Sequence, residues 1–125
     1  KGSDVNEGIF NGMLDVGIGG DTPAITACGN SDVRVYSLVD YSFSAIISKK
    51  YSTIEQLKGQ QIAFASGSNA HRMLLEVLKN NGLNEGSVDL IGMNINHMPS
   101  ALADDHISAF SAWNPVAITT INNHE

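Results

Sequence analysis

The stretch FASGSNAHRMLLEVLKNNG, residues 64–82, joins two different hydrophobic patterns and thereby indicates the fold. Residues 61–65 form a short run of the kind found in strands, and the run stops at the next residue. From Ala70 onward the apolar residues recur at helical spacing, and this pattern ends at Asn81-Gly82. The stretch therefore predicts a strand at 61–65 followed by a helix at 70–81. The residues that link them are Ser66, Gly67, Ser68 and Asn69.

The same alternation of strand and helix patterns extends over the rest of the chain. The predicted strands cover residues 14–18, 33–39, 42–48, 61–65, 88–93 and 107–113. The predicted helices cover residues 4–12, 23–28, 70–81 and 99–103, with a short helix after Ser52 and a last one from Asn114-Pro115. Asp4 with Glu7, and Ser52 with Glu55, are interpreted as capping boxes. Strands and helices that alternate with short connections are typical of βαβ units in a mainly parallel sheet, so the predicted fold class is α/β.

The amino-acid composition limits the classes of function that the protein can have. The chain has 125 residues, is 42% hydrophobic and carries a net charge of −6, which suits a globular domain. No basic cluster exceeds the pair Lys49-Lys50, which argues against nucleic acid as a partner. The four histidines show no metal-ligand spacing, and Asp104-Asp105-His106 is interpreted as a solvated loop. The single cysteine, Cys28, has no internal disulfide partner and is predicted to be a small core residue.

Three predicted strand-to-helix junctions carry small or capping residues. They are Gly20-Asp21-Thr22-Pro23, the linking residues 66–69, and Trp113-Asn114-Pro115. In open α/β sheets, ligands bind beyond the carboxyl ends of the strands. A helix start offers backbone N–H groups and a partial positive charge, so an acidic protein can hold an anion there without a basic patch. The same residue types cap helices and form turns in many proteins, so each junction also has a purely structural interpretation.

Two side chains at or next to these junctions, Trp113 and His71, have two interpretations each. Trp113, after the strand at 107–113, is either a core residue or a ring that stacks on a ligand. His71, in the first turn of the helix at 70–81, either donates to a ligand or lies on the surface.

Three segments of the chain resemble one family in order and spacing. LDVGIGGDTPAITA (14–27), STIEQLKGQQIAFASGSNAHRMLLEVLKNNGL (52–83) and ISAFSAWNPV (107–116) resemble the substrate-binding proteins of ABC importers for sulfonates, taurine and nitrate. These proteins are related to the binding proteins for pyrimidine thiamine precursors. The segment that contains LKG and GSNAH is the most specific, and it is closest to the sulfonate branch.

The resemblance implies a type II periplasmic binding-protein fold, in which two lobes close on a ligand. It places residues 1–45 in a partial first lobe and 46–125 in a nearly whole second lobe, with the crossing near 43–47. It also implies that the chain is part of a longer protein, with a further strand and helices before Lys1 and a return segment to the first lobe after Glu125. The ligand-binding residues that it implies are Gly20, Asp21, Thr22, Ser66, Gly67, Ser68, Asn69, His71, Trp113 and Asn114.

The function implied by the resemblance is capture of a small anionic solute and its delivery to an ABC-transporter permease. The location implied is periplasmic, or extracellular and anchored to the membrane. No catalysis, cofactor or metal is expected, and self-association of these 125 residues is expected if the first lobe is incomplete. Two alternatives stay open. One is a thiamine-pyrimidine-precursor binding or synthesis protein, although the synthase carries a cysteine cluster and this chain has only Cys28. The other is a ligand-sensing domain of a signalling receptor.

Overall fold

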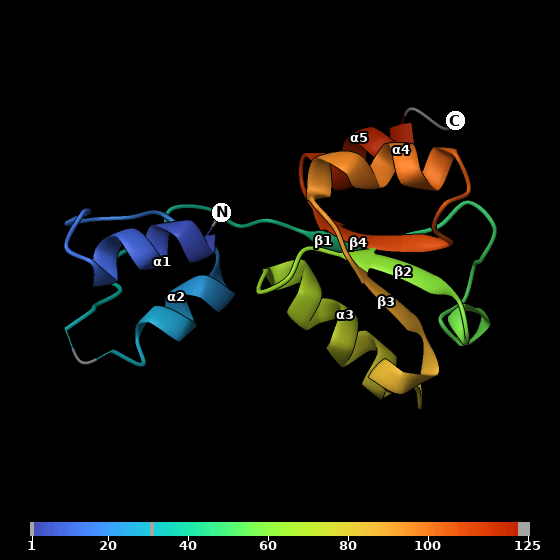
Figure 1. The fold of residues 1–125 in the computed structure, drawn as a ribbon, viewed down its shortest axis with the longest axis horizontal. Helices are drawn as coiled ribbons and strands as arrows, with labels where there is room; N and C mark the ends of the chain where they lie inside the picture. Colours follow the sequence, from blue (N-terminus) through green and yellow to red (C-terminus); the bar gives the residue numbers. More distant parts are fainter. Residues whose placement is uncertain (1, 31, 123–125) are drawn as a thin grey trace. The chain divides into compact units, whose positions relative to one another are not determined.

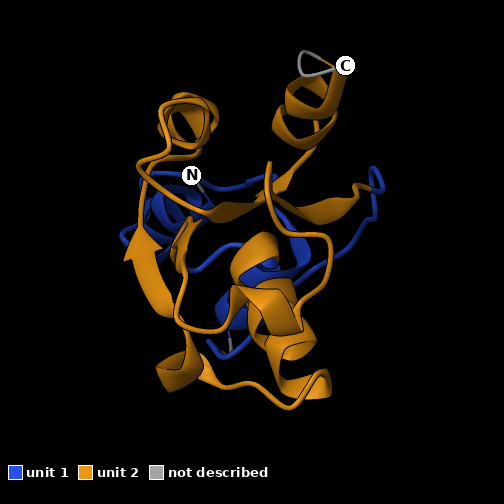
Figure 2. Cartoon of the chain, turned by 90° about the vertical axis from the view of Figure 1, so that its right-hand side faces the viewer, with its two compact units in different colours: residues 1–41, 67–69 blue, residues 42–66, 70–125 orange. Residues whose placement is uncertain are grey.

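A computed structural model of the chain describes residues 2–30 and 32–122, which form two compact units. Unit 1 consists of Lys1–Tyr41 together with Gly67–Asn69, and unit 2 of Ser42–Ser66 together with Ala70–Glu125 (Figure 2). The helices are α1 (Gly2–Phe10), α2 (Asp21–Ala27), α3 (Asn69–Asn80), α4 (Met98–Ala103) and α5 (Val116–Asn122). The strands are β1 (Ser44–Ile47), β2 (Gln61–Phe64), β3 (Asp89–Gly92) and β4 (Ala109–Trp113). Three short 3-10 helices cover Glu55–Leu57, Ile95–His97 and Glu85–Ser87.

Unit 2 is a four-stranded sheet with helices on both faces. The strand order is β1-β4-β2-β3. Strand β2 pairs in parallel with β3 and β4, while β1 pairs with β4 in the antiparallel direction. Helix α3 covers one face, and α4 and α5 cover the other (Figure 1). The mainly parallel α/β fold that the sequence predicted is confirmed.

Two hydrophobic clusters hold the helices of unit 2 to the sheet. Phe110, from β4, is fully buried in a cluster that also contains Met98 and Leu102 of α4. Ile62, from β2, is fully buried in a second cluster with Leu74 and Leu78 of α3. Because Leu74 and Leu78 are four residues apart, they lie on one face of the helix, as the sequence pattern predicted.

Unit 1 differs most from the sequence prediction. The described residues contain no strand at 14–18 or 33–39, although both segments have the expected composition. A strand exists only when its backbone N–H and C=O groups pair with a neighbour, and no described strand pairs with these two segments. Cys28, predicted as core, is exposed at the end of α2, and its neighbour Ala27 is buried instead. The core prediction for Cys28 is therefore wrong.

Both predicted capping boxes are also wrong. Helix α1 begins at Gly2, so Asp4 lies inside the first turn instead of before it. The 3-10 helix at Glu55–Leu57 has Ile54 before its first residue, and the Gln56 side chain accepts hydrogen bonds from the backbone N–H groups of Ser52 and Thr53. The side chain of Gln56, and not that of Glu55, therefore accepts the backbone hydrogen bond from Ser52.

Helix α2 also starts earlier than predicted. It begins at Asp21, so Pro23 occupies the third helical position instead of the first.

Apolar side chains remain uncovered in unit 1. Val16, Ile18 and Val35 are 58%, 74% and 60% exposed, whereas Val33 is half-buried. Large exposed apolar patches usually contact a partner. We expect these 125 residues to form dimers or larger species in analytical ultracentrifugation at micromolar concentration. A single monomeric species at all concentrations would contradict this expectation.

No helix in the described part of the chain is both long enough and apolar enough to cross a membrane.

Candidate functional site

In unit 1, the start of α2 lies against the segment Gly67–Asn69. Gly20 precedes the helix and has no side chain to cap it. The Thr22 backbone N–H instead donates to Asn69 Oδ1, at 3.2 Å, and to Asp21 Oδ1, at 2.6 Å. Asn69 thus acts as the cap of a helix that lies 47 positions earlier in the chain.

Gly20 is required for this contact. A Cβ atom at position 20 would lie 2.6 Å from Asn69 Oδ1 and 2.7 Å from Asn69 Nδ2. Gly67 has a φ of +70°, a left-handed conformation that residues with a side chain rarely adopt. The glycines therefore allow the two junctions to contact each other inside unit 1.

In unit 2, Ser66 and Asn114 follow two neighbouring parallel strands. Because β2 and β4 run in the same direction side by side, their carboxyl ends lie at one edge of the sheet. Ser44 of β1 pairs with Trp113, and the Asn114 backbone N–H donates to the Phe43 carbonyl oxygen at 3.2 Å. The backbone at this edge is therefore held by β1.

Trp113 and His71, the two aromatic site candidates of unit 2, are both partly covered by neighbouring side chains. Trp113 is half-buried and packs against the cluster around Phe110. The His71 ring packs against the Phe64 ring, with the ring centroids 4.3 Å apart and the planes inclined by 31°. His71 is therefore a partly covered residue of the first turn of α3, and not a fully exposed one.

The ten predicted ligand-binding residues fall into two groups. Six belong to unit 1: Gly20, Asp21, Thr22, Gly67, Ser68 and Asn69. Four belong to unit 2: Ser66, His71, Trp113 and Asn114. The geometry inside each unit is defined, and a single site formed by all ten residues stays a prediction. A hollow of about 390 Å³ beside α1 has a different lining, in which Glu7 and Leu14 take part, and it contains no predicted site residue.

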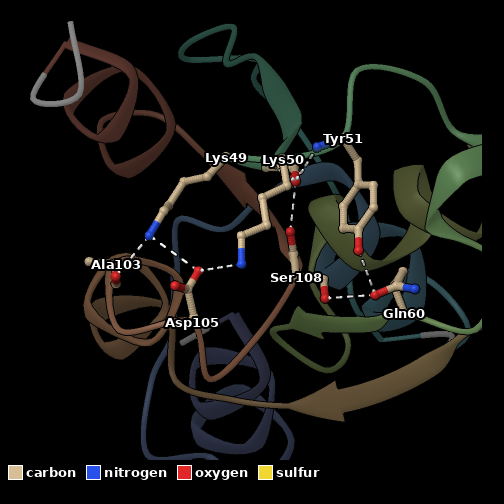
Figure 3. A network of polar contacts seen from close by, with 8 residues as sticks. Lys49, Lys50, Tyr51, Gln60, Ala103, Asp105 and Ser108 are labelled. Atoms are coloured by element: carbon tan, nitrogen blue, oxygen red, sulfur yellow. Dashed lines mark hydrogen bonds and ion pairs between the residues drawn. The ribbon is translucent and has the colours of Figure 1, made fainter.

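A polar network on unit 2 joins segments that the sequence did not link (Figure 3). Ser48 Oγ donates to the Ser108 carbonyl oxygen at 2.7 Å. The Gln60 side-chain oxygen accepts from Tyr51 Oη at 2.9 Å and from Ser108 Oγ at 3.1 Å. The network ties the chain after β1 to the beginnings of β2 and β4. Partners up to 60 positions apart leave no local sequence signal, so sequence analysis missed it.

The second part of this network surrounds Asp105. Lys49 Nζ donates to the Ala103 carbonyl oxygen at 2.8 Å, and both Lys49 and Lys50 pair with Asp105 Oδ1, at 3.3 and 3.1 Å. Hydrogen bonds from Lys50 and then from Lys49, together with the charges of both, lower the pKa of Asp105. Asp104, Asp105 and His106 are exposed, as predicted for a solvated loop. Among the described residues, no group of three metal-binding side chains comes together.

The lowered pKa of Asp105 predicts an acid-sensitive contribution to stability. Because the pKa is lower in the folded state, the ion pairs stabilise the fold at neutral pH, and this contribution disappears as the pH falls through the folded pKa. Asp105 has a φ of +57°, a conformation that asparagine also tolerates, so Asp105→Asn removes the charge and keeps the backbone. We expect the variant to have a slightly lower melting temperature at pH 7, and the difference from wild type to disappear as the pH falls below the ordinary pKa of an aspartate and through the lowered one. A difference that is the same at pH 7 and at low pH would contradict the assignment.

Comparisons with known proteins give the family of the chain. Residues 1–123 match the model of the family described as NMT1/THI5 like. A protein of Escherichia coli (strain K12), named provisionally as an aliphatic sulfonates-binding protein, is 28% identical over 120 residues, which are 91% of this chain and 38% of that protein. A binding protein of Brucella abortus (strain 2308), also provisionally named, is 29% identical over 114 residues, 90% of this chain and 35% of that protein. The chain thus spans little more than a third of these relatives.

Solved structures show the same fold. The periplasmic aliphatic sulphonate binding protein SsuA of Escherichia coli aligns with a TM-score of 0.75 at 23% identity, over 98% of this chain and 44% of that one. The alkanesulfonate-binding protein SsuA of Xanthomonas axonopodis pv. citri, solved with MOPS bound, aligns with a TM-score of 0.54 at 29% identity, over 59% of this chain and 26% of that one. Because the identity to the Escherichia coli protein is only 23%, that alignment supports the fold alone.

Proposed function

Because the chain belongs to the NMT1/THI5-like family, we propose that it is part of a solute-binding protein of an ABC importer. The match of residues 1–123 to the family model is the observation that carries the proposal. The relatives and structural neighbours described above are binding proteins, not enzymes. A binding role without catalysis agrees with this, and Cys28, the single cysteine, gives no support to a cysteine-rich enzyme.

The proposed ligand is a small anion, with a sulfonate as the first candidate and taurine and nitrate as others. The sulfonate candidate is supported by the name of the relative from Escherichia coli and by the names of the two structural neighbours. The physical support is the start of α3, a helix of 12 residues that follows a parallel strand and is preceded by serine and glycine. Hydrogen bonds to a charged group contribute about 1.5–3 kcal/mol each, so three or four of them can account for the roughly 8 kcal/mol of micromolar binding.

The proposed architecture has two lobes, residues 1–45 and 46–125, of which the first is partial. The ligand would be bound by the ten residues named above, contributed by both lobes. The proposed partner is an ABC-transporter permease, and the proposed location is the periplasm or the outer face of a membrane. The structural neighbour from Escherichia coli is described as periplasmic, which supports this location.

Calorimetric titration of the full-length protein tests the proposal. The panel contains hexanesulfonate, taurine and nitrate, with glucose and choline as neutral and cationic controls. We expect micromolar binding of at least one anion, saturation at one ligand per protein, and no binding of the two controls. A folded protein that binds no anion of the panel below about 1 mM would contradict the proposed function.

A further inference from the structure

Two asparagine–glycine steps, Asn11-Gly12 and Asn81-Gly82, directly follow the helices α1 and α3. Asparagine is a chemically labile residue, and a following glycine makes it more so, because no Cβ atom shields the backbone nitrogen that attacks the side-chain carbonyl carbon. Both asparagines are exposed, and the two glycines have φ values of +67° and +72°. The backbones at the two steps are therefore alike, and any difference in reactivity must come from their surroundings.

The side chains of the two asparagines are held differently. Asn81 Nδ2 donates to the Val77 carbonyl oxygen at 2.8 Å, so the amide must break this hydrogen bond before it can turn toward the Gly82 nitrogen. No described residue makes a hydrogen bond with the side chain of Asn11, which lines the hollow of about 390 Å³ beside α1. The amide of Asn11 can therefore turn without losing a partner within the described part of the chain.

The helices that precede the two steps also differ in how firmly they are packed. The N–H groups of Gly12 and Gly82 each donate to a helix carbonyl oxygen at 3.1 Å, and this bond must open before the nitrogen can react. Helix α3 buries three side chains, whereas none of residues 2–10 is buried. Helix ends with few buried contacts open more readily, so the Gly12 nitrogen is released more often than that of Gly82.

We propose that Asn11 is a site of spontaneous deamidation and that the fold protects Asn81 from the same reaction. The Gly12 backbone nitrogen loses its proton and forms a bond to Asn11 Cγ, the bond from Cγ to the side-chain nitrogen breaks, and ammonia leaves with the proton. Water then opens the resulting cyclic imide to aspartate or isoaspartate, so the reaction requires no oxidant and no cofactor. The inference goes beyond the proposed function and does not depend on it.

Either product places a new carboxylate at the C-terminal end of α1. This position is four residues after Glu7, and the C-terminal end of a helix carries a partial negative charge, so the added charge is unfavourable there. Deamidation would therefore change the protein locally, by one negative charge that loosens the last turn of α1.

Peptide mass spectrometry of the full-length protein, incubated in neutral and in mildly alkaline buffer at body temperature, tests the inference. We expect conversion at Asn11 to be about tenfold faster than at Asn81, the effect of one hydrogen bond that must be broken. The rate should rise with pH, because the attacking nitrogen must lose its proton. The variant Asn11→Gln, which keeps an amide but forms the ring far more slowly, should abolish the first conversion and leave the second unchanged.

Synthetic peptides of residues 6–16 and 76–86 separate the effect of the fold from that of the local sequence. Both contain the asparagine–glycine step without the packed protein around it, so they should react at similar rates. Equal rates at Asn11 and Asn81 in the protein, faster conversion at Asn81, or no conversion at Asn11 would overturn the inference. A difference between the peptides as large as the difference within the protein would overturn it as well, because the fold would then protect nothing.

Discussion

Replacing Ser68 by glutamate is expected to abolish binding of small anions and to leave the protein folded. Ser68 is half-buried and lies directly before α3, where the anion is proposed to bind. A carboxylate there would occupy the anion position and repel the ligand. The same charge is favourable at a helix start, so the stability of α3 should be maintained. Calorimetry should show an affinity at least 100-fold lower, with an unchanged circular dichroism spectrum.

Two further variants test whether the effect comes from the charge at position 68. One controls for the size of the new side chain, and the other for the change in the net charge of the protein. Ser68→Gln is as large as Ser68→Glu but neutral, so it should retain part of the affinity. Ser100→Glu adds the same charge at an exposed position of α4 and should bind as wild type does. Unchanged affinity in a folded Ser68→Glu variant would remove the anion site from the start of α3.

Replacing Phe110 by alanine should produce the largest loss of stability. Phe110 is fully buried in β4, between Ile47 on one side and Ala63 on the other, and packs in the cluster with Met98 of α4. Removing a buried phenylalanine ring leaves a cavity and costs about 3–5 kcal/mol. We expect urea unfolding of the variant to show a loss in this range.

Ile118→Ala provides the control for the Phe110 variant. Ile118 is exposed on α5, so truncation should change the free energy of unfolding by about 0.5 kcal/mol or less. Equal losses for the two variants would contradict the placement of the core around β4.

Sequence patterns predicted the elements of unit 2 well, because the strands of this unit find hydrogen-bonding partners within the unit. The strand at 61–65 and the helix at 70–81 are confirmed as β2 and α3, with ends shifted by one residue. The segments 14–18 and 33–39 have similar patterns but no pairing strand among the described residues. Periodicity reports which side chains suit a strand, whereas the strand itself depends on hydrogen bonds to a neighbour that the pattern does not contain.

The candidate site was predictable only in its local parts. Small residues at the starts of α2 and α3 are visible in the sequence, and the structure places them at those positions. The contact between Thr22 and Asn69 joins residues 47 positions apart. It leaves no local signal, because it depends on which segments the fold brings together.

The claim that the edge formed by the ends of β2 and β4 borders an anion site can be tested at Trp113. This residue is the only tryptophan of the chain, and it is half-buried at the end of β4. Its fluorescence should be titrated with hexanesulfonate in the full-length protein, after any tryptophan outside these 125 residues has been replaced. We expect an emission shift that saturates with the anion and is absent with glucose or choline, because the bound ligand and closure of the lobes exclude water from the ring. A flat response to every small anion, with a Trp113→Phe variant that binds as tightly as wild type, would place Trp113 in the core alone and contradict the claim.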